Sequence, residues 1–267
     1  MKLDFYVPTP ESPEWGSKRA FTETIRLISS RGYDGIELAP YSLRRMHTDR
    51  IRKLAVTHGL EIVCVASAFI ILQHGLTISH PNRSIRRRAV GKLKESITCA
   101  CELEANYVSI GLVRGKQLRG ASFERGWKNI VDCVRQCGEY AKNYNVSLLI
   151  EPENTYETGF VHTVAEGLRI LDEISLDNVG LMIDSYHMNI EESDINRAVR
   201  ASSSRLLHVH VADSNRLAPG MGHIDFKSFI KSLRHIGYDS FLGVEVKPFP
   251  DMPSVIGKSI TFLKEVV

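Results

Sequence analysis

Four residues of the types that bind metals stand at the ends of the last four apolar runs of this 267-residue chain. They are Glu151 in VSLLIE, Asp184 in VGLMID, His210 in LLHVHVAD and Glu245 in LGVEV. If these runs are parallel strands of one closed barrel, the four side chains, called the tetrad below, surround a single point. Three carboxylates and one imidazole make a mainly oxygen-based site, which favours Mn²⁺, Mg²⁺ or Co²⁺ over a structural zinc.

Each member of the tetrad alone has a plainer interpretation. A carboxylate that ends a buried run, such as Glu151, avoids the cost of burial by pairing with Lys or Arg as readily as by binding a metal. A single histidine in a strand is more often a hydrogen-bonded core residue than a ligand. Three carboxylates at matching strand ends favour the metal site. Strand alternation places His208 on the same side as His210, so we expect His208 to pack beside the site.

Short runs rich in Val, Ile and Leu alternate with longer segments of helical period, as in strands that crossover helices cover on both faces. Eight strands are predicted, at 3–7, 35–39, 61–66, 107–111, 146–151, 179–184, 206–212 and 242–246. Helices are predicted between them, at 18–30, 44–58, 83–104, 122–143, 163–174, 194–202, 226–236 and 253–265. Such β/α units without a linker predict an α/β fold, a (β/α)₈ TIM barrel with one domain over 1–267.

Two connections and three glycines fit this barrel. The longest strand-to-helix connections, 67–82 and 213–225, would lie on the face where barrel enzymes place their chemistry. Gly32, Gly59 and Gly237 each follow a predicted helix and precede a strand, where a left-handed helix cap suits glycine.

The amino-acid composition and net charge exclude several classes of function. Hydrophobic residues make up 43% of the chain and charged residues 24%, which is typical of a globular protein. A net charge of +3 gives no reason to expect nucleic acid or a membrane surface as a partner. No apolar stretch reaches the ~18 residues of a membrane helix. The five cysteines form no C-x-x-C pair, and the N-terminus lacks a secretory signal, so we expect a cytoplasmic protein with reduced thiols.

The segments around the tetrad resemble a known family. ENTYE at 153–157, DSYHMNIEE at 184–192, HVHVADSNRLAPG at 208–220 and VEVKP at 244–248 are similar to signature segments of the ketose 3-epimerases. That group, which includes D-tagatose and D-psicose 3-epimerases, belongs to the xylose-isomerase-like sugar isomerase/epimerase superfamily. The resemblance covers essentially the whole chain, and IGLVRG with HVADSNRLAPG is most similar to 5-keto-L-gluconate epimerases.

The resemblance implies a role for each residue of a site. It assigns the metal, with Mn²⁺ expected and Mg²⁺ or Co²⁺ as alternatives, to the tetrad, and catalysis to Glu151 and Glu245. It assigns contacts with a small-molecule sugar substrate to Glu157, His187 and Arg216, called the rim trio below. It also implies a homodimer or homotetramer.

A mechanism follows from this assignment. A metal chelated by the carbonyl and a neighbouring hydroxyl of a ketose would acidify the C3 proton and stabilise a cis-enediolate. Glu151 and Glu245 would exchange the proton on opposite faces.

Three alternatives use the same barrel. An aldose-ketose isomerase would need an identical tetrad. A barrel subunit of a carbon-glycoside-cleaving complex would need a partner chain. An apurinic-site endonuclease would need additional histidines for a trinuclear zinc site, and the third and fourth strands end in Ala66-Ser67 and Ile110-Gly111 instead.

Overall fold

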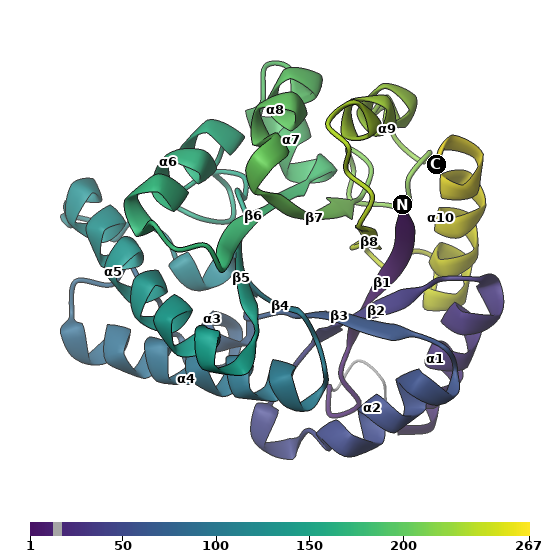
Figure 1. The fold of residues 1–267 in the computed structure, drawn as a ribbon, viewed down its shortest axis with the longest axis horizontal. Coiled ribbons are helices and arrows are strands. Elements are labelled where there is room, and N and C mark those ends of the chain that lie inside the picture. The colour runs from purple at the N-terminus through teal and green to yellow at the C-terminus, as the bar shows by residue number, and fades with distance from the viewer. Residues whose placement is uncertain (13–17) are drawn as a thin grey trace.

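Parallel strands form a closed ring with the helices outside it in the computed structural model, which describes residues 1–12 and 18–267 (Figure 1). Each strand pairs with the next one along the chain, and β8 closes the ring on β1. The strands are β1 Lys2–Pro8, β2 Gly35–Ala39, β3 Glu61–Val65, β4 Tyr107–Ile110, β5 Ser147–Ile150, β6 Val179–Asp184, β7 Leu206–Val211 and β8 Phe241–Val244. The predicted (β/α)₈ barrel is confirmed.

Burial on both faces explains why the strands are apolar runs. All six residues of β6 are buried, because one face meets the barrel interior and the other meets the helices. The outer helices present apolar stripes to this ring, and together they make one continuous core. The helices are α1 Lys18–Arg31, α2 Thr48–Thr57, α3 Phe69–His74, α4 Arg83–Glu102, α5 Phe123–Ala141, α6 Val164–Ile174, α7 Ser185–Glu191, α8 Ile195–Ser202, α9 Phe226–His235 and α10 Met252–Val266.

Local chemistry fixes where several helices begin and end. Thr163 and Glu166 form a reciprocal capping box at the start of α6. Gly32, Gly59 and Gly237 have φ values of +88°, +66° and +74°, as predicted for left-handed caps.

The predicted element boundaries differ from the observed ones at several strand and helix ends, of which the following bear on the site or the loops. β5 and β8 end one residue before Glu151 and Glu245, because the chain leaves the ladder where these side chains turn to the barrel mouth. The predicted helix at 44–58 divides into a 3₁₀ turn, Leu43–Arg45, and α2. The connections after β3 and β6 contain two short helices that were not predicted, α3 and α7.

Among the described helices, none combines the length and apolar character needed to cross a membrane.

Candidate metal centre

The tetrad converges at the mouth of the barrel. One ligand atom from each residue lies within 4.8 Å of all the others. His210 Nδ1 is 3.6 Å from Glu151 Oε1, 4.0 Å from an Asp184 oxygen and 3.5 Å from Glu245 Oε2. Ligands at ~2.0–2.2 Å from one ion lie roughly 3 to 4.3 Å apart in octahedral geometry. The spacing therefore fits one divalent cation.

Three of these four ligand atoms have no hydrogen-bond partner in the described part of the chain. Glu151 Oε1, Asp184 Oδ2 and His210 Nδ1 are buried and accept or donate no hydrogen bond within residues 1–12 and 18–267. Buried polar atoms normally have partners, so three orphaned atoms that face one point indicate a bound ligand. Asp184 uses its other oxygen, Oδ1, to accept from Tyr186 N at 2.6 Å, which caps α7 and fixes the carboxylate.

The rim trio lies beside the tetrad. Arg216 Nη2 donates to Glu245 Oε2 at 2.7 Å, and its Nη1 is 3.3 Å from His187 Nε2 and 3.6 Å from Glu157 Oε1. The guanidinium also stacks over the Tyr186 ring at 4.9 Å. Arg216 has φ of +59°, an uncommon conformation for a residue with a side chain. Such local strain is retained where the surroundings fix a side chain for a purpose.

Opposite charges set the ionisation of the site without a metal. Burial raises the pKa of Glu245, but the charges of Arg216 and His210 outweigh burial and lower it to about 2. Burial lowers the pKa of His210, but Glu37, Glu151 and Glu245 outweigh burial and hold it well above its usual value. In the metal-free site these effects favour the protonated form of the His210 ring and the ionised form of Glu245.

The loop after β4 is anchored by a buried ion pair. Arg114 is completely buried and lies 3.2 Å from Glu153 Oε2, and it also donates to the carbonyl of Phe160 at 3.1 Å. A side chain at Gly111 would collide with Glu153 Oε1 and approach Glu151 Oε2 to 2.9 Å, so the glycine leaves room for both carboxylates.

A family model described as "Xylose isomerase-like TIM barrel" matches residues 25–266. The chain belongs to this family. A D-psicose 3-epimerase of Ruminiclostridium cellulolyticum is 26% identical over 250 residues, which cover 91% of this chain and 83% of that protein. A 3-dehydro-D-guloside 4-epimerase of Escherichia coli is 33% identical over 118 residues, which cover 44% of this chain and 45% of that protein.

Solved structures agree on the fold of this family member. The crystal structure of a D-allulose 3-epimerase from Methylomonas sp. in complex with D-allulose has a TM-score of 0.87 to it. The superposition covers 100% of this chain and 98% of the other at 23% sequence identity.

Sequence reasoning missed four polar residues around the site. Glu37 and Asp4 are buried within the barrel, and each was visible as one acid in an apolar strand, the signal that identified Glu245. Asn154 is buried, and its Nδ2 lies 2.7 Å from His187 Nδ1. Asp213 shapes the loop after β7 by accepting from Ser214 N, Gly220 N and Ile224 N. Nothing in the sequence distinguishes the last two from ordinary loop residues.

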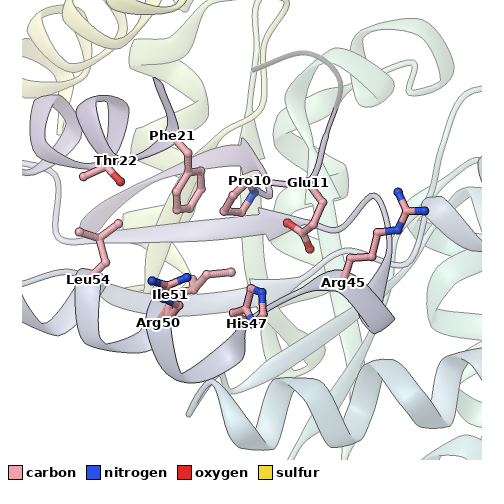
Figure 2. A pocket seen from close by; sticks show the side chains of 9 residues that line it. All are labelled: Pro10, Glu11, Phe21, Thr22, Arg45, His47, Arg50, Ile51 and Leu54. Atoms are coloured by element: carbon pink, nitrogen blue, oxygen red, sulfur yellow. The ribbon is translucent and has the colours of Figure 1, made fainter. Parts of the chain in front are cut away.

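A cavity of about 300 Å³ lies apart from the tetrad, between α1 and α2 (Figure 2). Its walls come from the connections after β1 and β2 and from the two helices, and include Glu11, Arg45 and His47. None of the tetrad or the rim trio lines this cavity. It is therefore not the candidate site.

Proposed function

We propose that this protein is a metal-dependent epimerase that acts at C3 of a ketose or a keto sugar acid. The main support for this proposal is the position of two glutamates, Glu151 after β5 and Glu245 after β8. Their carboxylate oxygens lie 3.6 and 3.5 Å from His210 Nδ1. Epimerisation needs an acid or base on each face of a planar intermediate, and we assign Glu151 and Glu245 to these two roles.

The tetrad would hold one divalent cation, and we propose Mn²⁺. Bound there, the metal would act as a Lewis acid on the substrate carbonyl and so acidify the neighbouring C–H bond. The donor set of three carboxylates and one imidazole favours a hard cation.

The two glutamates carry the proton. One carboxylate removes the proton from C3, the electron pair of the C–H bond forms the C2–C3 π bond, and the π pair of the C2 carbonyl moves onto its oxygen to give an enediolate. The other glutamate returns a proton to C3 from the opposite face, which inverts that carbon and leaves the formula of the sugar unchanged. Glu151 and Glu245 exchange these roles when the reaction reverses.

The rim trio would orient the sugar. Arg216 and His187 can donate to the oxygens on the carbonyl side and offset the charge that develops during proton removal. Glu157, at 3.6 Å from Arg216, would hold the guanidinium or accept from a substrate hydroxyl.

The position of the carbonyl in the substrate decides which carbon is inverted. The relatives include a D-psicose 3-epimerase and a 3-dehydro-D-guloside 4-epimerase. The inverted carbon is next to the carbonyl in both cases, because C3 neighbours the carbonyl of a 2-ketose and C4 neighbours the carbonyl of a 3-dehydro sugar. The match to the D-psicose 3-epimerase covers more of this chain, which supports a 2-ketose and inversion at C3.

The test incubates the Mn²⁺-loaded protein in D₂O with a panel of ketohexoses, ketopentoses and 5-keto-hexonates. The metal is then removed, and NMR spectra of the sugars are recorded. Deuterium at C3 together with the C3 epimer supports the proposal. An aldose product labelled at C2 would assign an aldose-ketose isomerase instead. No label with any substrate would favour a barrel that works only with a partner chain.

We propose a homodimer or homotetramer in the cytoplasm. Leu72, Tyr156 and Phe249 are 67%, 74% and 62% exposed, and all three follow strands at the rim of the barrel mouth. Exposed apolar side chains on one rim are typical of a surface that another subunit covers. Light scattering after size-exclusion chromatography would measure the mass against the 30.0 kDa chain.

A further inference from the structure

Ionisable side chains also lie inside the barrel, beneath the tetrad. Asp4 on β1, Glu37 on β2 and His208 on β7 have exposed fractions of 0%, 1% and 0% and are called the buried polar layer below. The interior of such a barrel is ordinarily filled by branched apolar residues. Three buried ionisable groups therefore need a physical reason.

Glu37 connects this layer to the tetrad. Its Oε1 lies 2.6 Å from His208 Nε2 and 2.9 Å from His210 Nε2. A carboxylate only accepts hydrogen bonds, so each ring donates from Nε2. In neutral His210 the other nitrogen, Nδ1, then carries no proton, and Nδ1 is the atom that faces the tetrad carboxylates.

We propose that Glu37 is a positioning residue of the metal centre, which holds His210 in the tautomer that presents an unprotonated Nδ1 to the cation. This inference rests on the metal site of the proposed function. Neither the sugar nor the carbon that is inverted enters it.

The backbone is arranged so that Glu37 can reach His210. Strand register places Asp184, His210, Gly243 and Asp4 side by side on β6, β7, β8 and β1. A side chain at Gly243 would collide with Glu37 Oε1 and approach Asp4 Oδ1 to 2.6 Å. Because Gly243 on β8 has no side chain, the Glu37 side chain has room to extend from β2 to His210 on β7.

A second metal ion is the competing explanation of this cluster. Ligand atoms of Glu37, His208 and His210 also lie within 4.8 Å of one another. However, their separations from Glu37 Oε1 are 2.6 and 2.9 Å, which are hydrogen-bond lengths, whereas ligands of one ion lie roughly 3 Å or more apart. The tetrad atoms have the wider spacing, and three of them, Glu151 Oε1, Asp184 Oδ2 and His210 Nδ1, have no hydrogen bond within residues 1–12 and 18–267, so the cation belongs there.

The first experiment compares Mn²⁺ affinity by calorimetric titration of the metal-free protein. Glu37→Gln keeps the shape but removes the charge that makes His210 a better ligand, so we expect 10- to 100-fold weaker binding, about the effect of losing such a partner. Asp4→Asn is the matched control, since Asp4 is equally buried in the layer but lies outside the hydrogen bonds to His210. It should bind Mn²⁺ like the wild type.

The second experiment needs no variant. Long-range ¹H–¹⁵N NMR of the Mg²⁺-loaded wild type reports which ring nitrogen of His210 carries the proton. We expect the proton on Nε2 and Nδ1 bound to the metal. A Gly243→Ala variant should also weaken Mn²⁺ binding, because the added methyl group would collide with Glu37 Oε1 and lie 3.0 Å from His210 Cδ2.

The outcomes separate this inference from the proposed reaction. Unchanged Mn²⁺ affinity in folded Glu37→Gln, an equal loss in Asp4→Asn, or a proton on His210 Nδ1 would each overturn the positioning role. If no sugar is converted but Glu37→Gln still weakens Mn²⁺ binding, the reaction is wrong and the positioning role stands. A wild type that binds no Mn²⁺ would overturn both.

Discussion

The guanidinium of Arg216 donates to the carboxylate of Glu245 at 2.7 Å, so one arginine holds a tetrad residue and also lies beside His187 and Glu157. Arg216 follows β7 and Glu245 follows β8, and the adjacent backbone is joined by Lys247 N donating to the Arg216 carbonyl at 2.8 Å. The loop after β7 is therefore fixed to the strand that supplies a catalytic candidate. Movement of this loop would disturb both residues together.

Replacing Arg216 tests its part in this pairing. Arg216→Met keeps most of the volume and removes the charge-assisted hydrogen bond, worth about 1.5–3 kcal/mol, so we expect kcat/KM to fall roughly 10- to 150-fold. Steady-state kinetics at saturating Mn²⁺ measures the loss. Arg119→Met is the control, because Arg119 is an exposed arginine on the same rim with no ion pair in the part of the chain that the structure describes. If kcat/KM fell in Arg119→Met but not in Arg216→Met, the role assigned to Arg216 would be wrong.

The two glutamates should be separately essential. Glu151→Gln and Glu245→Gln each remove one proton carrier while the amide oxygen can still reach a cation, so we expect turnover to fall at least ~1,000-fold in either variant. The measurement is the rate of epimer formation at a metal concentration where binding is shown to be saturated. Substantial turnover by either variant would rule out a mechanism with two carboxylates.

The fold and the tetrad could be predicted because their signals are periodic and local. Glu151, Asp184 and Glu245 each interrupt or end an apolar run, and eight such runs with helices between them permit few topologies. The helix α7 could not be predicted, because its start depends on Asp184 acting as a cap while the same residue faces the tetrad.

The contacts that cross the barrel were beyond sequence reasoning for a different reason. Glu37 meets His210 from 173 residues away, and the gap at Gly243 has no meaning until β8 is placed between them. Sequence periodicity gives the face on which a side chain lies, but the partner depends on strand tilt and on the size of every neighbour. A buried acid could therefore be noticed, but its partner could not.

Metal binding should become tighter as pH rises through neutrality. The carboxylates around His210 raise its folded pKa well above the usual range of a histidine, which favours the protonated ring in the metal-free protein, and this proton must be released to bind a cation. Calorimetry of Mn²⁺ binding in buffers of different ionisation enthalpy should show about one proton released.

The same pKa shift predicts the direction in which the stability of the metal-free protein changes with pH. A raised folded pKa stabilises the metal-free protein fully below pH ~6.5, and this stabilisation is lost as pH rises through the folded value. The Tm of the metal-free wild type should therefore lose this contribution on raising the pH, whereas His210→Asn should lack it. An identical pH dependence in the two proteins would contradict a charged His210.

Gly111→Ala should weaken the metal site without touching a ligand. The added methyl group would collide with Glu153 Oε1 and come within 2.9 Å of Glu151 Oε2, so one carboxylate must move. We expect lower Mn²⁺ affinity with the fold retained, measured by titration and circular dichroism. Gly91→Ala, in the middle of α4 with open space around it, is the control and should bind Mn²⁺ normally.

The Arg114–Glu153 pair should matter for stability more than for catalysis. Arg114→Met leaves the Glu153 carboxylate buried without its cation, which costs about 3–5 kcal/mol in comparable buried pairs. Burial raises the pKa of Glu153 and the charge of Arg114 opposes this rise, so the arginine is the group that favours the buried carboxylate. Urea unfolding of Arg114→Met, Glu153→Gln and the double variant gives the coupling energy. The double variant should be more stable than Arg114→Met, because it leaves no unpaired charge. If the two losses simply add, Arg114 acts through its bonds to the Phe160 and Ile110 carbonyls rather than through the ion pair.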